Sequence, residues 1–247
     1  MTYCLGMRTE EGLVGIADTL ITSGNELTRS KKLTCISHGQ GSLFLLTSGL
    51  RSVSDKAITY FSEHLAGLDE PCDRMFKTVN IFSQMLRQVS AEDKSFLQES
   101  GLLFNVHCLI GGQMAADQAH SLYLVYPQGN WVEISEETPY QIIGAPGYGK
   151  PILDRTFSNT DSLAFAVKVG CLSFDSTRIS AADVDFPMDV VLYRKNSFKM
   201  IQHRFLQDDL AEISIWWDDV LRKGIKELPN EWIDGLLHKL NANGGRQ

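Results

Sequence analysis

The sequence has no long hydrophobic run of the kind that membrane insertion requires. Its longest apolar runs, such as residues 43–46 and 102–104, are far shorter than the ~20 residues of a membrane-spanning helix. The N-terminal residues also lack the charged segment and apolar stretch of a secretory signal. Basic residues are fewer than acidic ones: the sequence has 23 Lys and Arg and 30 Asp and Glu, which gives a formal net charge of -7. We therefore expect no membrane and no nucleic-acid partner, since phosphate binding needs a basic surface.

Cysteine and histidine spacings typical of metal or redox sites are absent as well. The cysteines are odd in number and never form a C-x-x-C pair; they are Cys4, Cys35, Cys72, Cys108 and Cys171. The histidines show neither i, i+4 pairing nor Cys or Asp at ligand spacing. This pattern predicts reduced, mostly buried thiols in the cytoplasm and no metal site. No serine lies in a G-x-S-x-G elbow, and we expect no cofactor.

Blocks of short strands separated by pairs of helices are predicted from the spacing of apolar residues. The predicted strands cover residues 2–7, 12–17, 32–37, 42–47, 104–110, 121–126, 130–134, 140–144, 188–193 and 198–201, with a turn at Gly24-Asn25. The predicted helices cover 53–65, 75–89, 148–157, 161–178 with a cap at Asn159-Thr160-Asp161, and most of the last forty or so residues. This order differs from the strict alternation of a doubly wound sheet and favours an α+β fold. It predicts a single domain over 1–247, with a C-terminal helical extension at about 205–242.

A glycine-rich segment at residues 144–151, GAPGYGKP, matches the first part of a phosphate-binding loop, G-x-x-x-x-G-K. However, Pro151 occupies the position whose hydroxyl would bind Mg²⁺, and Pro146 removes a backbone N–H from the loop. The favoured interpretation is a glycine-rich turn with Pro151 in the first turn of a helix. A nucleotide-binding module is the alternative, and thermal protection by ATP would reveal it.

Thr2 has the chemistry of an N-terminal nucleophile once Met1 is removed, and aminopeptidases remove Met1 readily when residue 2 is small. A threonine hydroxyl is a poor nucleophile and needs a base. The α-amino group of the same residue, with an ordinary pKa of about 7.7–8.0, can accept its proton directly or through a water. A nearby buried lysine would favour the unprotonated amine, and an aspartate would keep that lysine charged and in place.

Three further segments resemble the proteasome β-subunit family of N-terminal nucleophile hydrolases. They are residues 12–19 (GLVGIADT), Lys32 after a turn, and residues 47–50 (TSGL) before a predicted helix. In that family, the strand that begins with the catalytic threonine pairs with a strand that ends in Gly-Ala-Asp, and a lysine begins the next strand region. The resemblance is specific over about the first 55 residues and architectural from there to about residue 200.

The resemblance implies a role for each matching residue. Thr2 becomes the nucleophile and amine base, Asp18 the orienting carboxylate, Lys32 the charge-tuning amine, and Gly49 the donor of the oxyanion-hole N–H. Lys32 is preferred to Lys31 because the residues after it best match the family's apolar strand, and adjacent side chains of a strand point to opposite faces. Taken singly, Asp18 could be a turn residue and Lys32 a surface lysine.

Two features depart from the family's pattern. Ala145 stands where many β-subunits have a serine near the active threonine. The supporting Asp and Ser pair is also displaced, and its closest counterparts are Ser180 and Asp183 in exchanged order, with Asp175 as another candidate. These departures concern the fine tuning of the site and leave the nucleophile unchanged.

The resemblance implies a four-layer α-β-β-α sandwich and a threonine-type peptidase or amide hydrolase that acts on peptides or unfolded proteins. Members of that family assemble into rings or open spirals, so the resemblance also implies a homo-oligomer. An unfoldase or adaptor is a further candidate partner. The bacterial ancestral β-subunit is the most similar branch, because no propeptide precedes Thr2 and the C-terminal helix is long and carries Trp216-Trp217. The alternative is a non-catalytic scaffold or assembly subunit, which retention of Met1 would favour. Arg51, near the expected mouth of the substrate pocket, points to acidic or polar substrate side chains.

Overall fold

The computed structural model describes residues 2–23 and 26–243 of the chain. The chain divides into two compact units, with the boundary between Gln207 and Asp208. The first unit contains two five-stranded sheets, and the second contains helices. Met1, the turn predicted at Gly24-Asn25, and residues 244–247 lie outside the described residues.

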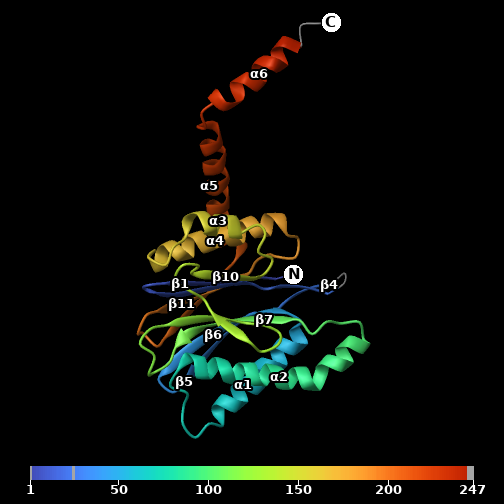
Figure 1. The fold of residues 1–247 in the computed structure, drawn as a ribbon, viewed down its shortest axis with the longest axis vertical. Helices are drawn as coiled ribbons and strands as arrows, with labels where there is room; N and C mark the ends of the chain where they lie inside the picture. The colour runs from blue at the N-terminus through green and yellow to red at the C-terminus, as the bar shows by residue number, and fades with distance from the viewer. Residues whose placement is uncertain (1, 24–25, 244–247) are drawn as a thin grey trace. The chain divides into compact units, whose positions relative to one another are not determined.

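The two five-stranded sheets of the first unit are antiparallel and lie face to face (Figure 1). The first sheet consists, in spatial order, of β10 (Tyr140–Gly144), β1 (Tyr3–Thr9), β2 (Gly12–Asp18), β11 (Met188–Arg194) and β12 (Met200–Phe205). The second consists of β5 (Leu33–His38), β6 (Gly41–Gly49), β7 (Val106–Gln113), β8 (Ser121–Val125) and β9 (Trp131–Glu133). A separate hairpin follows β2 and consists of β3 (Leu20–Ser23) and β4 (Glu26–Arg29).

Helices cover the outer face of each sheet, so the first unit has four layers (Figure 1). The helices on the first sheet are α3 (Lys150–Thr156) and α4 (Leu163–Ser180), and those on the second are α1 (Arg51–Ala66) and α2 (Met75–Glu99). Helices α1, α2 and α4 present apolar side chains to their sheets; α1, for example, buries Val53, Ala57, Phe61 and Leu65 at helical spacing. The predicted α+β fold with an α-β-β-α layer order is therefore confirmed.

Strands β1 and β2 are buried on both faces, since α4 packs on one side and the second sheet on the other. Every residue of β2 is buried, which explains its near-continuous apolar sequence. Between the sheets, Leu13 and Val191 pack with Phe44 and Leu109 of the second sheet. The apolar layers keep water away from the end of β2, where Asp18 is fully buried.

The structure differs from the sequence predictions at several places; for example, α2 continues to Glu99, beyond the predicted end at residue 89. The β3–β4 hairpin was not predicted, because β4 is exposed along its whole length and has no apolar alternation. Helix α4 begins after Ser162, whose hydroxyl accepts a hydrogen bond from the Phe165 N–H, and not after the predicted cap at 159–161. Strand β12 begins at Met200 and not at Phe198, because Phe198 lies in the loop between β11 and β12 with a positive φ of 50°.

The second unit consists of α5 (Gln207–Lys226), whose first residue precedes the unit boundary, and α6 (Glu231–Asn243). No residue of α5 is buried, although its sequence is amphipathic. The exposed apolar side chains of these helices include Ile213, Ile215, Trp216, Val220, Leu221, Ile225, Trp232, Leu236, Leu237 and Leu240. These side chains give the unit an unusually apolar surface.

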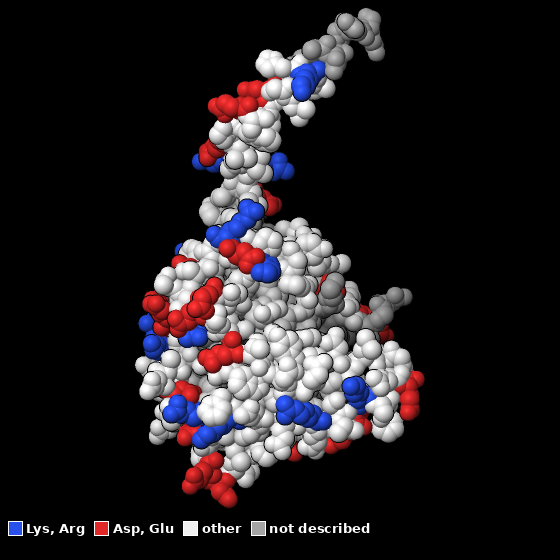
Figure 2. All heavy atoms as spheres, viewed as in Figure 1, with Lys and Arg blue, Asp and Glu red and all other residues white. Residues whose placement is uncertain are grey.

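Charges are mixed on the molecular surface. On the face of the first unit shown in Figure 2, Lys and Arg are interspersed with Asp and Glu. In the described part of the chain, we find no helix long and apolar enough to span a bilayer.

Candidate active site

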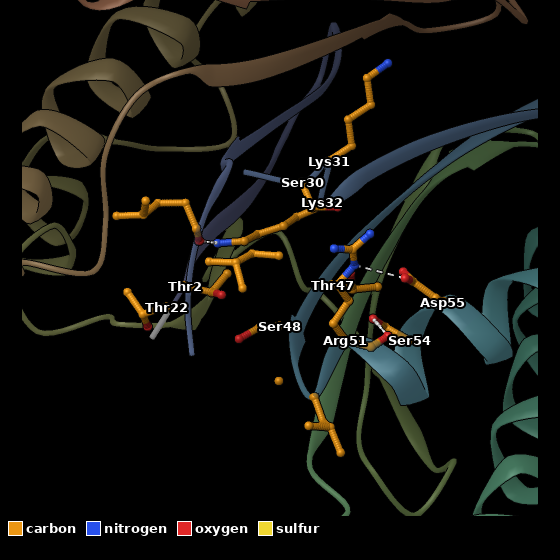
Figure 3. A pocket seen from close by; sticks show the side chains of 14 residues that line it. Thr2, Thr22, Ser30, Lys31, Lys32, Thr47, Ser48, Arg51, Ser54 and Asp55 are labelled. Carbon is orange, nitrogen blue, oxygen red and sulfur yellow. Dashed lines mark hydrogen bonds and ion pairs between the residues drawn. The ribbon is translucent and has the colours of Figure 1, made fainter. Parts of the chain in front are cut away.

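Thr2 directly precedes β1 and lines a pocket of about 390 Å³ (Figure 3). Its carbonyl oxygen accepts a hydrogen bond of 2.8 Å from the N–H of Ala145, which ties the residue to the end of β10. The side chain is 8% exposed. The rest of the lining comes from β3, from the residues before β5, and from the end of β6 with the start of α1; it comprises residues 20–22, 30–32, 47–51, 54 and 55.

Tyr3 holds the chain on the C-terminal side of Thr2. Its hydroxyl lies 2.7 Å from Ser173 Oγ on α4, and its ring packs edge-on against Phe174. Its backbone N–H donates to Asp18 Oδ1 at 2.9 Å. Because the ring is fully buried, the residue next to Thr2 is held by both its side chain and its backbone.

Asp18 and Lys32 form a buried ion pair beside the pocket. The Lys32 ammonium donates to Asp18 Oδ1 at 2.7 Å, to Asp18 Oδ2 at 2.8 Å and to the Leu20 carbonyl oxygen at 2.6 Å. Three acceptors match the three N–H bonds of an ammonium group. Lys32 also lines the pocket, whereas Asp18 is not among the described residues that line it.

The contacts of Asp18 are those of an ionised carboxylate. Besides Lys32, its oxygens accept hydrogen bonds from the N–H groups of Tyr3 and Leu20. An ionised carboxylate only accepts hydrogen bonds, and here every contact is a donor. Burial raises the pKa of Asp18, and the charge of Lys32 together with the two backbone donors counters that rise. The cation is therefore essential to the charge state of Asp18.

Gly49 ends β6 and lines the pocket. Its φ of 119° is a conformation that side chains rarely adopt, and an added Cβ would lie 2.0 Å from the Asn105 carbonyl oxygen. The next residue, Leu50, donates its N–H to the same oxygen at 2.8 Å. Glycine is therefore required where the chain turns from β6 into α1.

The structure brings together Thr2, Asp18, Lys32 and Gly49, but it places the two supporting candidates elsewhere. Ser180 is the exposed last residue of α4, and Asp183 lies partly buried in the loop before β11. Neither is among the described residues that line the pocket. Their supporting role remains a prediction.

Ser48 is a pocket residue to which the sequence interpretation gave no role. Its hydroxyl lies 3.3 Å from the point where a Cβ on Gly144 would stand. It therefore lies close to the loop in which Ala145 replaces the family's serine. Its position within the 47–50 segment was the available signal, but its closeness to Gly144 depends on how the two sheets pack against each other.

The glycine-rich segment at 144–151 forms the turn from β10 into α3. An added Cβ on Gly149 would lie 2.3 Å from Ser173 Oγ, so close packing on α4 accounts for this glycine. Lys150 forms an ion pair with Asp154 at 2.7 Å and also donates to Tyr140. These contacts favour the structural interpretation of the segment.

The chain closely resembles solved structures of the ancestral β-subunit, Anbu. For an Anbu mutant from Hyphomicrobium sp. strain MC1, the TM-score is 0.85 at 30% identity, covering 92% of this chain and 99% of that one. Anbu from Yersinia bercovieri gives 0.85 at 27% identity, covering 92% and 97%, and the helical assembly of the Anbu complex from Pseudomonas aeruginosa gives 0.85 at 28%, covering 92% and 97%.

No protein-family model and no curated protein matches the chain. The structural likeness nevertheless extends over almost the whole length of each Anbu chain, at an identity that reaches 30%. By fold, length and sequence, the chain belongs to the Anbu family of ancestral proteasome β-subunits.

Proposed function

We propose that the chain is a threonine-type amide hydrolase in which Thr2, after removal of Met1, is the nucleophile. The observation that carries this proposal is the shared pocket: Thr2, Lys32 and Gly49 all line it, and Lys32 is held from behind by Asp18. A lone N-terminal threonine would carry little weight. A buried lysine that lines the same pocket as the threonine and is paired with a carboxylate is a specific arrangement for activating a hydroxyl.

In the proposed reaction, the α-amino group of Thr2 takes the hydroxyl proton, directly or through a water, as the oxygen attacks the substrate carbonyl. The Lys32 charge favours the unprotonated amine and the developing negative charge. The Gly49 N–H stabilises the oxyanion. The protonated amine then gives its proton to the leaving amine, and water releases the acyl group from Thr2 by the reverse sequence.

The test is the intact mass of the assembled protein before and after incubation with a peptide epoxyketone. This reagent closes a ring with both the hydroxyl and the free amine of an N-terminal threonine. We expect loss of Met1 and a single adduct, with none in Thr2→Ala. If the assembled protein retains Met1, the mechanism is excluded and the scaffold alternative takes its place.

We further propose that copies of this chain assemble through the apolar faces of α5 and α6. The Pseudomonas aeruginosa relative is described as a helical assembly. In this chain, Ile213, Val220 and Leu221 fall on one side of α5 and are exposed. An apolar stripe of this kind is suited to burial against another copy.

Placing a charge in this stripe is expected to reduce the size of the assembly. Ile213→Glu combined with Leu221→Glu should shift the mass measured by sedimentation or light scattering towards the monomer, because two carboxylates would be buried unpaired. Arg222→Glu changes the charge on the opposite side of the same helix and should leave the mass unchanged. Equal masses for the double variant and the wild type would exclude α5 as a contact.

A further inference from the structure

We propose that the pocket beside Thr2 selects substrates that carry a carboxylate side chain next to the scissile carbonyl. The inference rests on the proposed function and defines its substrate class. Arg51 is the first residue of α1, two positions after Gly49. Figure 3 shows Thr2 and the Lys32 amine on one side of the pocket and Arg51 with Asp55 on the other. A side chain that enters the pocket from an acyl group on Thr2 therefore faces Arg51.

The Arg51 guanidinium is only partly used by its own helix. Its Nε donates to Asp55 Oδ2 at 3.0 Å, and within the described part of the chain the terminal nitrogens make no hydrogen bond. Both side chains are more than half exposed, at 56% and 58%, so their ion pair is weak. The terminal N–H groups can therefore bind a second carboxylate, for which the planar guanidinium is well shaped.

The start of α1 adds positive potential at the same place. This 16-residue helix begins at the pocket, and its first turn contains no acidic residue. Its N-cap, Leu50, has no side chain that could accept a hydrogen bond from the first N–H groups. The partial positive charge of the helix end is thus left for a bound group.

The remaining charges do not cancel this potential. Asp55 is the only acidic residue among the described residues that line the pocket. Lys32 is balanced by Asp18 behind the pocket, and Lys31 extends away from Thr2 in Figure 3. Arg51 and the helix end therefore outweigh Asp55, and the pocket favours an anionic side chain over a neutral one of the same shape.

The experiment uses peptide epoxyketones that differ only in the side chain beside the reactive group: glutamate, glutamine or leucine. Rates of adduct formation are followed by intact mass on the assembled wild-type protein. We expect the glutamate reagent to react about tenfold faster than the glutamine reagent, as a charge-assisted contact would give. The ratio should fall at high salt, since the site is open to solvent.

Variants assign the preference to Arg51. Arg51→Gln should bring the glutamate-to-glutamine ratio close to one, Arg51→Lys should retain part of it, and Asp55→Asn should raise it. Lys77→Gln is the matched control, because it removes one charge from the exposed Lys77–Asp73 pair at the start of α2, which has the same i, i+4 spacing. Its ratio should equal that of the wild type.

The outcomes separate the two proposals. A leucine or glutamine reagent that reacts as fast as the glutamate reagent overturns the preference while leaving Thr2 as the nucleophile. A ratio that Arg51→Gln does not change also overturns it. No adduct with any reagent, together with retained Met1, overturns the proposed function and this inference with it.

Discussion

Lys32→Met is expected to lower the free energy of unfolding at neutral pH by about 3–5 kcal/mol, the range for breaking a buried ion pair from one side. The substitution leaves the Asp18 carboxylate at 0% exposure with two backbone donors and no cation. Burial raises the pKa of Asp18, and Lys32 is the first group that counters it. The destabilisation therefore arises from the uncompensated carboxylate, and denaturant titration measures it. Adduct formation on Thr2 should be lost as well.

This loss of stability is expected to become smaller in acid. Without Lys32, the pKa of Asp18 in the folded chain rises further above its unfolded value of about 3.9. When the pKa of a carboxyl group is higher in the folded chain than in the unfolded chain, the folded chain binds the proton more tightly. The resulting stabilisation is full at a pH below the unfolded-state pKa and is lost as the pH rises through the folded-state pKa. The gap between variant and wild type should thus be narrower at pH ~5 than at pH ~7. A constant gap would contradict the assigned cause.

Two comparisons isolate the buried charge. Lys31→Met removes the adjacent lysine, which is exposed and makes no ion pair with the described residues, so stability should change by no more than about 0.5 kcal/mol. Asp18→Asn combined with Lys32→Met removes both charges and should regain part of the loss. If the double variant is as unstable as the sum of the single variants, lost packing is the better explanation.

Gly49→Ala is expected to cost roughly 3 kcal/mol of folding stability, the upper end for a residue forced into a disfavoured backbone region. The new Cβ would stand 2.0 Å from a carbonyl oxygen, which is backbone and cannot rotate away. Relief requires the turn between β6 and α1 to move, and this displaces the proposed oxyanion donor. Thermal unfolding and the rate of adduct formation should both register the change.

Gly67→Ala provides the control for this substitution. Gly67 follows α1 with a φ of -89°, and an added Cβ would lie 3.5 Å from the Glu63 carbonyl oxygen, an ordinary contact distance. We expect no loss of folding stability, or a gain of about 0.4–1 kcal/mol, because alanine reduces the conformational entropy of the unfolded chain. Equal effects of the two substitutions would show that strain at Gly49 is not the cause.

The strands that position the site could be predicted because they are buried and apolar. Strands β1, β2 and β6 lie close to their predicted bounds. Lys32, which was preferred to Lys31, is buried, whereas Lys31 is exposed. Strand β4 could not be predicted, because pairing between exposed residues leaves no apolar pattern.

The surroundings of each site residue were beyond sequence reasoning. The backbone donors to Asp18 come from Tyr3 and Leu20, and any residue type except proline could supply them. The closeness of Ser48 to the Gly144 loop depends on the approach of two sheets. Composition and spacing do not predict such contacts. They do indicate a position such as Gly49, where the backbone conformation requires glycine.

The ion pair behind the pocket joins two sheets that are built from different parts of the chain. Asp18 ends a strand of the first sheet, and Lys32 directly precedes a strand of the second. The flanking partners of β1 and β2 are β10 and β11, which are synthesised more than a hundred residues later. Asp18 therefore gains its neighbouring strand β11 only after residue 188 has been made, so the ion pair can reach its full burial only late in synthesis.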